Sequence, residues 1–394
     1  MMAQRTMNPA PRPRPVLLCL SHLRWDFVFQ RPQHLLTQAA ATYEVIFFEE
    51  PKPTAQLDDV PHLQVRRTQE GVLVATPLLP SGLDVLSAEA SQRELLDKML
   101  SDLGAPVTVA WYYTPMALAF AGHVAAGVVV YDCMDELSLF RGASPRLALL
   151  ERQLLKRADL VFTGGRSLHE AKRRFHPRTH LFPSSVDTAH FGRARSAMVA
   201  DPADQAGLPE PRIGFFGVLD ERIDLALVES VAAARPNWQL VMLGPTAKID
   251  PAMLPQRPNL HWLGMKSYAQ LPEYLAGWDA GLMPFASNEA TRFISPTKTP
   301  EFLAAGVPLV STSVPDVVAD WGLDKLVGIA DGLDQVVSTL EAAMARPRKP
   351  WLANVDRRLN HLSWKATWVR MRALIEDAAE RQGARAPMVV LSRL

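Results

Sequence analysis

The chain has 394 residues, which favours two domains because single hydrophobic cores seldom grow beyond about 250–300 residues. Apolar residues account for 48% and charged residues for 21%, a composition typical of a globular protein with ample core. The formal net charge of +1 provides no overall attraction to nucleic acid, so a nucleic-acid partner is not expected.

Targeting and redox signals are sparse. Cys19 and Cys133 lie in apolar runs and are expected to be buried thiols rather than a disulfide or metal framework. Residues 1–15 are rich in Pro and Arg and lack the apolar core of a signal peptide, so we expect a disordered tail. The longest near-apolar run, 116–131, is too short and too interrupted to span a bilayer. The expected compartment is the cytoplasm.

The first half of the chain alternates predicted strands and helices. Strands are expected at 16–20, 43–48, 63–66, 72–76, 107–112, 127–131, 159–163 and 179–183. Helices are expected near Pro32, at 88–103 and 144–158, and after a capping box formed by Ser167 and Glu170. This alternation predicts an α/β domain at 16–192 with a mostly parallel, doubly wound sheet.

The second half repeats the pattern after a polar linker at 193–210. Strands are expected at 212–217, 239–243, 260–263, 280–284, 307–311 and 326–329, which places a second Rossmann-like domain at 211–350. A long helical pattern follows within residues 351–394. Its apolar side chains, Trp364, Trp368, Met371 and Leu374, recur on one face and require a partner surface.

The stretch 288–312 carries the clearest candidate site. Pro300 restricts its helix to a start within one turn before it, with Ser295 or Thr297 as the expected cap. Free backbone N–H groups and Lys298 would then stand at the carboxyl end of a strand, where anions and nucleotides bind in α/β sheets. Glu301, one turn further on, suits a ribose diol. The alternative is an ordinary strand-loop-helix with a solvated lysine.

Several common catalytic signatures are absent from the sequence. There is no GxGxxG after the first strand, no GxxxxGK[ST], no GxSxG and no Cys/His pair at zinc spacing. These absences argue against a dinucleotide oxidoreductase, a P-loop NTPase, an esterase and a zinc enzyme.

Five segments together resemble glycosyltransferase family 4, whose members have the GT-B fold of two tandem Rossmann-like domains. HLFPSSVDTAHF (180–191) resembles the segment that joins the family's domains. IGFFGVLDERIDLALV (213–228), WQLVMLGP (238–245), NLHWLG (259–264) and SPTKTPEFLAAGVPLVST (295–312) resemble its donor-binding half in order and spacing. The opening SHLRWDFVFQRPQHLL (21–36) is similar to bacterial transferases of cell-surface polysaccharide assembly. The resemblance also implies a C-terminal helix that crosses back to the first domain.

The resemblance implies a nucleotide-sugar site in the second half. Glu301 would bind the ribose and Lys298 the diphosphate. Family members often carry a basic residue directly after the loop glycine; here Val218 holds that position, so Arg222 is assigned to the diphosphate, with a surface ion pair to Asp220 or Glu221 as the alternative. The base would rest on backbone near 244–245 and 263–265. The predicted donor-site residues are Gly217, Arg222, Gly244, Pro245, Gly264, Ser295, Pro296, Thr297, Lys298 and Glu301.

The acid-base residue is expected from the first half. Asp132 and Asp135 directly follow the strand 127–131, and a carboxylate in a closed cleft can deprotonate an acceptor hydroxyl. Their alternative role is capping of the following turns. The first loop supplies four further candidates for acceptor or donor contact, with loop packing as the alternative: His22, Arg24, Trp25 and Asp26.

One position departs from the family. The first Glu of the EX7E motif would lie eight positions before Glu301, and that residue is Phe293. Recognition of the sugar hydroxyls is therefore lost or moved, for example to Asn288 or Glu289. Retention of the anomeric configuration, which often accompanies the motif, is in doubt.

Basic residues are in excess between 141 and 178, including Lys172-Arg173-Arg174. This region is either a solvated face or a peripheral contact with anionic lipid at the inner face of the plasma membrane, where each basic group contributes roughly 1 kcal/mol.

The predicted function is a hexosyltransferase-like GT-B enzyme that moves a sugar from a nucleotide diphosphate to a glycan or lipid-linked acceptor. No cofactor and no metal are expected, and UDP- or GDP-sugars are the first donors to consider. Two alternatives remain: a nucleotide-sugar epimerase or hydrolase, and a non-catalytic nucleotide-sugar binder.

Overall fold

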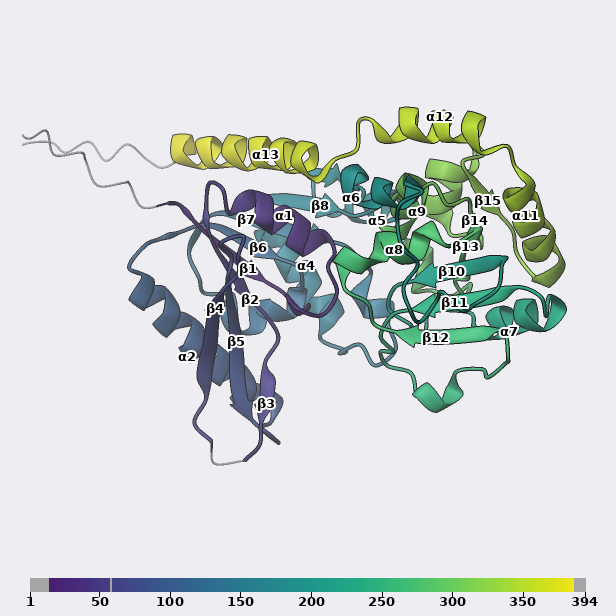
Figure 1. The fold of residues 1–394 in the computed structure, drawn as a ribbon. Coiled ribbons are helices and arrows are strands. Elements are labelled where there is room, and N and C mark those ends of the chain that lie inside the picture. The colour runs from purple at the N-terminus through teal and green to yellow at the C-terminus, as the bar shows by residue number, and fades with distance from the viewer. Residues whose placement is uncertain (1–13, 57–58, 386–394) are drawn as a thin grey trace, which may run out of the picture.

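The structure is a computed structural model that describes residues 14–56 and 59–385. Two α/β halves lie side by side, each built on its own sheet (Figure 1). The predicted tail at 1–15 falls outside the described residues except for its last two positions. Residues 386–394 of the predicted C-terminal segment fall outside them as well.

The first sheet contains nine strands within the described residues. Their order is β3-β5-β2-β1-β6-β7-β8-β9, with β4 paired antiparallel to β5 and every other neighbour parallel. The strands are β1 (Val16–Leu20), β2 (Glu44–Phe48), β3 (Lys52–Thr54), β4 (His62–Arg67), β5 (Leu73–Pro80), β6 (Val107–Tyr112), β7 (Ala126–Cys133), β8 (Leu160–Thr163) and β9 (Thr179–Leu181).

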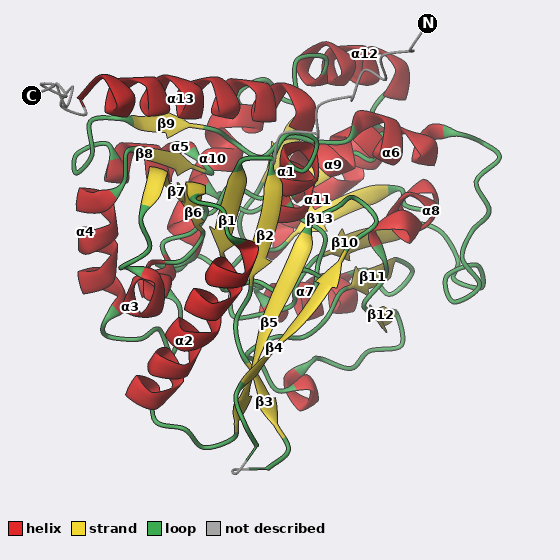
Figure 2. Cartoon of the chain, turned by 90° about the vertical axis from the view of Figure 1, so that its left-hand side faces the viewer, coloured by secondary structure: helices red, strands yellow, loops and turns green. Residues whose placement is uncertain are grey.

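Helices cover both faces of this sheet, as Figure 2 shows from the side of the first half. One apolar core packs α1 (Arg31–Ala39) and the last helix of the chain against the sheet. The core on the other face takes side chains of α2 (Val85–Leu103), α3 (Leu118–Ala121) and α4 (Leu147–Arg157), and that of Leu168 on α5 (Arg166–Lys172).

The second sheet is parallel throughout, in the order β12-β11-β10-β13-β14-β15. Its strands are β10 (Arg212–Phe216), β11 (Gln239–Leu243), β12 (Leu260–Gly264), β13 (Ala280–Met283), β14 (Leu309–Ser311) and β15 (Val327–Ile329). Strand order reverses between β10 and β13. In open α/β sheets ligands bind in the crevice at such a reversal, so the loops after β10 and β13 mark the expected site.

The helices of the second half are α6 (Thr188–Gly192), α7 (Leu225–Ala234), α8 (Leu271–Ala276), α9 (Lys298–Ala305), α10 (Pro315–Val317), α11 (Leu333–Ala345) and α12 (Arg348–Leu359). Helix α12 was not predicted as a separate element; one long helix was expected within residues 351–394. Pro350 lies in the first turn of α12, where proline is tolerated. Helix α12 packs into the core of the second half through Trp351, Val355 and Leu359.

The last helix, α13 (Trp364–Arg385), returns to the first half, which confirms the predicted crossing. Trp364, Trp368 and Met371 are buried in the first core, so the apolar face has the partner it requires. The return takes place between α12 and α13, later than residue 351.

Stacked rings join the two places where the chain crosses between the halves. His190, on α6, stacks on Tyr268 at a centroid distance of 4.1 Å. His34, on α1, meets the same tyrosine edge-on at 5.4 Å and stacks on Trp364 at 4.5 Å. Both crossings therefore pack into one aromatic cluster, defined by these four residues.

The predicted capping box at the start of α5 is wrong. Glycine at position 165 flanks the helix, and Ser167 bonds across to Asp316 of the second half, through its N–H at 3.0 Å and its hydroxyl at 2.5 Å. A tertiary partner has replaced the local one, Glu170.

Candidate functional site

The start of α9 stands at the reversal point of the second sheet. The helix begins at Lys298, and its flanking residue Thr297 makes no side-chain cap. The expected cap by Ser295 or Thr297 is therefore not formed. The first backbone N–H groups of a helix lack intrahelical partners, so an uncapped start with a lysine favours an anion.

Two glycines bring the neighbouring loops close to this helix start. Gly217 has φ +142°, and a Cβ there would collide with the Lys298 side chain. Gly244 has φ +139°, and a Cβ there would collide with the Gly217 carbonyl oxygen. Only glycine fits both positions, so the loops after β10 and β11 pack backbone to backbone beside Lys298.

Glu301 is the most strongly perturbed acid of the site. Its side chain is 6% exposed and, among the described residues, has no hydrogen-bond or ion-pair partner. Burial raises the pKa of Glu301 to about 8, opposed by the charge of Lys298, and burial lowers the pKa of Lys298. A buried carboxylate without a partner is costly, so a ligand hydroxyl that donates to it would be favoured.

Arg222 forms the ion pair that was its alternative role, and its assignment to the diphosphate stays a prediction. Its guanidinium bonds both carboxylate oxygens of Asp220, with Nη2 at 2.6 Å, so the alternative ion pair is formed. The same group lies 4.0 Å from Asp135 of the first half and 5.4 Å from the centre of the Phe140 ring. Arg222 therefore faces the gap between the halves while it remains paired.

Sequence reasoning missed Lys248. Its Nζ lies 5.4 Å from the centre of the Phe140 ring that Arg222 also contacts. The Leu219 N–H donates to Pro245 at 2.9 Å and the Ala247 N–H donates to Leu219 at 2.9 Å, so sheet pairing continues into these loops. Lys248 has φ 59°, a costly left-handed conformation that concentrates at functional sites. No periodicity or motif could have revealed it.

The two predicted catalytic carboxylates differ sharply. Asp132 is fully buried, and Arg31 holds both of its oxygens at 3.0 and 2.9 Å while donating to the Phe182 carbonyl at 2.7 Å. Asp132 thus ties α1 to β7 and the end of β9, a structural role that removes it as a base. Asp135, 28% exposed, is the carboxylate that meets the second half.

The four predicted residues of the first loop also differ in their surroundings. His22 is half-buried, its Nδ1 has no partner in the described part of the chain, and burial lowers its pKa while the charge of Asp135 raises it. Arg24 donates to the carbonyls of Glu50 and Pro51, both at 2.9 Å. The Trp25 ring packs edge-on against Phe47 at 5.1 Å, and Asp26 pairs with Arg66. Loop packing therefore accounts for Arg24 and Trp25, and a role of His22 in the site stays a prediction.

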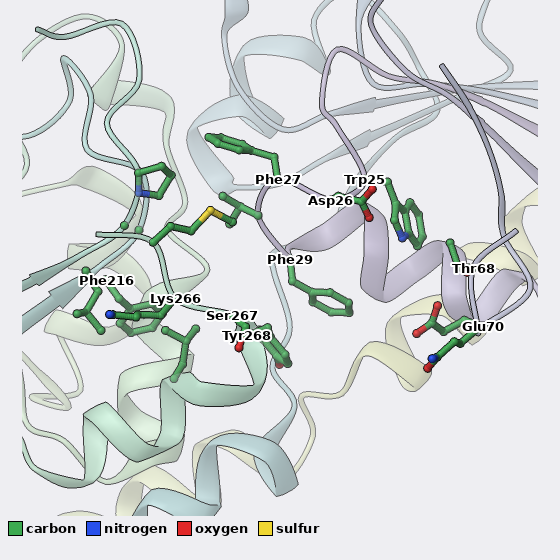
Figure 3. A pocket seen from close by; sticks show the side chains of 18 of the residues that line it. Trp25, Asp26, Phe27, Phe29, Thr68, Glu70, Phe216, Lys266, Ser267 and Tyr268 are labelled. Atoms are coloured by element: carbon green, nitrogen blue, oxygen red, sulfur yellow. The ribbon is translucent and has the colours of Figure 1, made fainter. Parts of the chain in front are cut away.

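A cavity of about 550 Å³ lies between the halves (Figure 3). Its second-half wall includes the predicted base-site residues Gly244 and Pro245, together with the segment 265–268. Its first-half wall is the segment 25–29, with residues 66–70, the end of β4 and the turn after it, at the far end. Phe27 and Phe29, which the sequence did not single out, point into this space in Figure 3.

Beyond β8 and β14 the two halves touch directly. A Cβ at position 165 would collide with Asp316 and come within 2.7 Å of the Ser295 Cβ. Arg166 bonds Asp320 in the same seam. Phe293, at the position where the resembled family has Glu, is partly buried against the apolar core of the first half. This position therefore serves contact between the halves.

Neither a membrane-spanning helix nor a metal-binding cluster is present among the residues that the structure describes. No described helix combines the length and apolarity that a bilayer crossing requires. Within residues 14–56 and 59–385, no group of three or more His, Cys, Asp or Glu side chains is placed to hold a metal ion. Metal independence stays a prediction.

Comparison with known proteins agrees with this geometry. Residues 210–344 match the family model described as glycosyl transferases group 1. TuaH of Bacillus subtilis (strain 168), named as a teichuronic acid biosynthesis glycosyltransferase, is 26% identical over 221 residues, covering 52% of this chain and 55% of TuaH. The chain thus spans about half the length of this curated relative.

Solved structures match over nearly the whole chain. Sucrose-phosphate synthase from Thermosynechococcus elongatus has a TM-score of 0.70 and 15% identity, covering 93% of this chain and 100% of that one. An E. coli trehalose-6-phosphate structure bound with UDP-2-fluoro glucose has a TM-score of 0.67 and 14% identity, covering 93% and 99%. These matches confirm the GT-B fold and the resemblance to glycosyltransferases that the sequence predicted.

Proposed function

We propose that the chain is a glycosyltransferase that moves a sugar from a nucleotide-diphosphate donor to a glycan or lipid-linked acceptor in cell-surface polysaccharide or glycolipid synthesis. The observation that carries the proposal is the start of α9. Lys298 lies against Gly217, the carboxylate of Glu301 is buried one turn further into the helix, and Asp135 of the first half lies 4.0 Å from Arg222 of the loop after Gly217. UDP- and GDP-sugars are the first donors to test.

The chemistry follows from the charges around the cleft. As the anomeric carbon–oxygen bond breaks, negative charge develops on the leaving diphosphate, and the start of α9, Lys298 and Arg222 would stabilise it. The acceptor hydroxyl oxygen forms the new bond to the anomeric carbon. Its proton passes to Asp135, or to His22 beside it. Lys248 would add a third positive charge on the side of the first half.

The direct test begins with donor binding. Thermal shift should identify a nucleoside diphosphate sugar that stabilises the protein, and product analysis with lipid-linked oligosaccharide should then detect transfer. Asp135→Asn should lower kcat about a hundredfold or more while donor affinity changes less than threefold. Asp102→Asn, at an exposed position on α2, is the matched control. Stabilisation by no nucleotide sugar at all would refute the proposal.

Phe293 supports a second candidate, a protein that binds or hydrolyses nucleotide sugars without transfer. An aromatic side chain at this position cannot accept hydrogen bonds from sugar hydroxyls as Glu would. Donor consumption measured with and without acceptor lipid separates the cases. A transferase consumes donor only with acceptor, a hydrolase consumes it in either mixture, and a binder consumes none.

A lipid-linked acceptor would make membrane contact useful. In the basic region the side chains of Arg152, Lys156, Arg173 and Arg174 are exposed. Lys172 is unavailable, because it is buried between Glu136 and Glu151 at 2.6 and 2.7 Å.

Sedimentation with vesicles tests this contact. The parent should bind vesicles containing phosphatidylserine, and the double variant Arg152→Gln/Lys156→Gln should bind them less. The charge-matched control is Lys349→Gln/Arg357→Gln, at two exposed positions on α12. Equal binding by both double variants would count against this surface.

A further inference from the structure

We propose that Phe27, from the first half, forms the outer wall of the nucleobase site in the second half. The inference rests on the proposed use of a nucleotide-sugar donor. Under this proposal the nucleobase of the donor contacts both halves, the second half through its loops and the first half through Phe27.

The floor of the site is mostly backbone. Gly217, Gly244 and Pro245 line the cavity where β10 and β11 end, and Met265 follows β12. Gly244 packs directly against the Gly217 carbonyl, so this part of the floor consists of peptide groups rather than side chains. This floor offers a base one face and leaves the other face uncovered.

Apolar side chains of the first half face this floor. Phe27 is 40% exposed and Phe29 is 38% exposed, and both line the same cavity as Met265 of the floor, which is 48% exposed. Large apolar side chains gathered in one concave site indicate a ligand surface. Figure 3 shows the Phe27 ring on the cavity side of its loop, in the part of the space away from Trp25 and Glu70.

Phe29 and Phe27 have different surroundings. The Phe29 ring stacks on Tyr268 of the second half at 4.6 Å and meets His34 edge-on at 4.7 Å, so it is already occupied. Phe27 has no ring partner among the described residues. Its face is therefore available for stacking, and a nucleobase is the part of the donor that has a π-face to offer.

The loop that carries Phe27 is held in place before any ligand binds. The Phe27 N–H donates to the Arg24 carbonyl at 3.3 Å, and Arg24 itself is bonded to the carbonyls of Glu50 and Pro51. Together with the Phe29–Tyr268 stack, these contacts fix the loop at both ends. A preorganised ring loses little conformational freedom on stacking, which favours affinity.

The test compares ligands with and without a base. Calorimetry would measure UDP, GDP and ADP, and separately inorganic pyrophosphate, on the full chain. Phe27→Ala should weaken the tightest of the three nucleotides at least tenfold, about 1.4 kcal/mol, and leave pyrophosphate affinity unchanged. Phe27→Trp should stay within threefold of the parent. Phe175→Ala, at a phenylalanine of the same half that is 69% exposed, is the matched control and should change neither ligand.

Three results would overturn the inference. Nucleotide affinity of Phe27→Ala equal to that of the parent would do so, and so would an equal loss for pyrophosphate, which would indicate a displaced loop. A raised KM for the acceptor with unchanged nucleotide affinity would assign the wall to the acceptor. A parent that binds no nucleotide would instead refute the proposed function itself, so the two failures are distinguishable.

Discussion

Glutamine at position 301 should make the free protein more stable and its nucleotide affinity weaker. Glu301 has a folded-state pKa of about 8 against an ordinary value of 4.5. Because its pKa is raised, the folded state holds the proton more tightly than the unfolded state does. Protonated Glu301 therefore makes its full contribution to the free energy of unfolding below pH 4.5, and this contribution is lost as the pH rises toward 8. Glu301→Gln cannot ionise and should keep that contribution at every pH.

The magnitude follows from the size of the shift. One pKa unit corresponds to about 1.36 kcal/mol, so integration gives about 1 kcal/mol at pH 5 and about 3 kcal/mol at pH 7. For a domain of 150–250 residues each kcal/mol moves Tm by about 2–4 °C, so the variant should melt roughly 6–12 °C higher at pH 7.

The assay is a pair of thermal melts, at pH 5 and pH 7, for Glu301→Gln and for Glu94→Gln, an exposed glutamate on α2 that serves as control. Nucleotide titrations at pH 6.5 and 8.5 complete it. Parent affinity should rise with pH as the carboxylate forms, and that of the variant should stay flat. A Tm difference between Glu301→Gln and the parent that is the same at pH 5 and pH 7 would refute the reasoning, because burial of the charge would then not be its cause.

Three further predictions concern donor binding, metal dependence and the packing of α13. Lys298→Ala should weaken nucleotide-sugar binding more than tenfold, about 1.4 kcal/mol, by calorimetry. Lys325→Ala, which alters a lysine with positive φ like Lys248, is the control and should have no effect. EDTA should leave turnover largely unchanged, since protein cations face the diphosphate; activity that is lost with chelator and restored by manganese would contradict this. Trp368→Ala should cost about 3–5 kcal/mol in chemical denaturation, because the ring is 4% exposed in the first core, and an unchanged unfolding midpoint would contradict that packing.

The order and type of most elements could be predicted because each sheet is built from local patterns. Apolar runs such as 16–20, 107–112 and 239–243 match their strands to the residue. The predictions were wrong where a contact with a residue far away in the sequence determines the local structure. Ser167 bonds Asp316 rather than its local capping partner, and no local pattern could indicate that contact.

In the candidate site, too, residues positioned by local structure could be predicted, and residues that depend on distant contacts could not. Lys298 and Glu301 could be placed from Pro300 and the strand before it, because helix geometry fixes their relative positions. The choice between Asp132 and Asp135 required Arg31, which lies 101 positions away from Asp132 in the chain. Phe27 stayed unrecognised, because its significance depends on a wall contributed by the other half of the chain.

The ring stack of His190, Tyr268, His34 and Trp364 constrains how the two halves can move. It joins both places where the backbone crosses between them, and two fixed points on a rigid body define a line. Relative motion is then reduced to one angular degree of freedom about that line. Opening should leave the rings packed and separate contacts away from them, such as the Arg141 N–H donating to Glu221 at 2.8 Å. A spectroscopic distance across that pair would thus report this rotation.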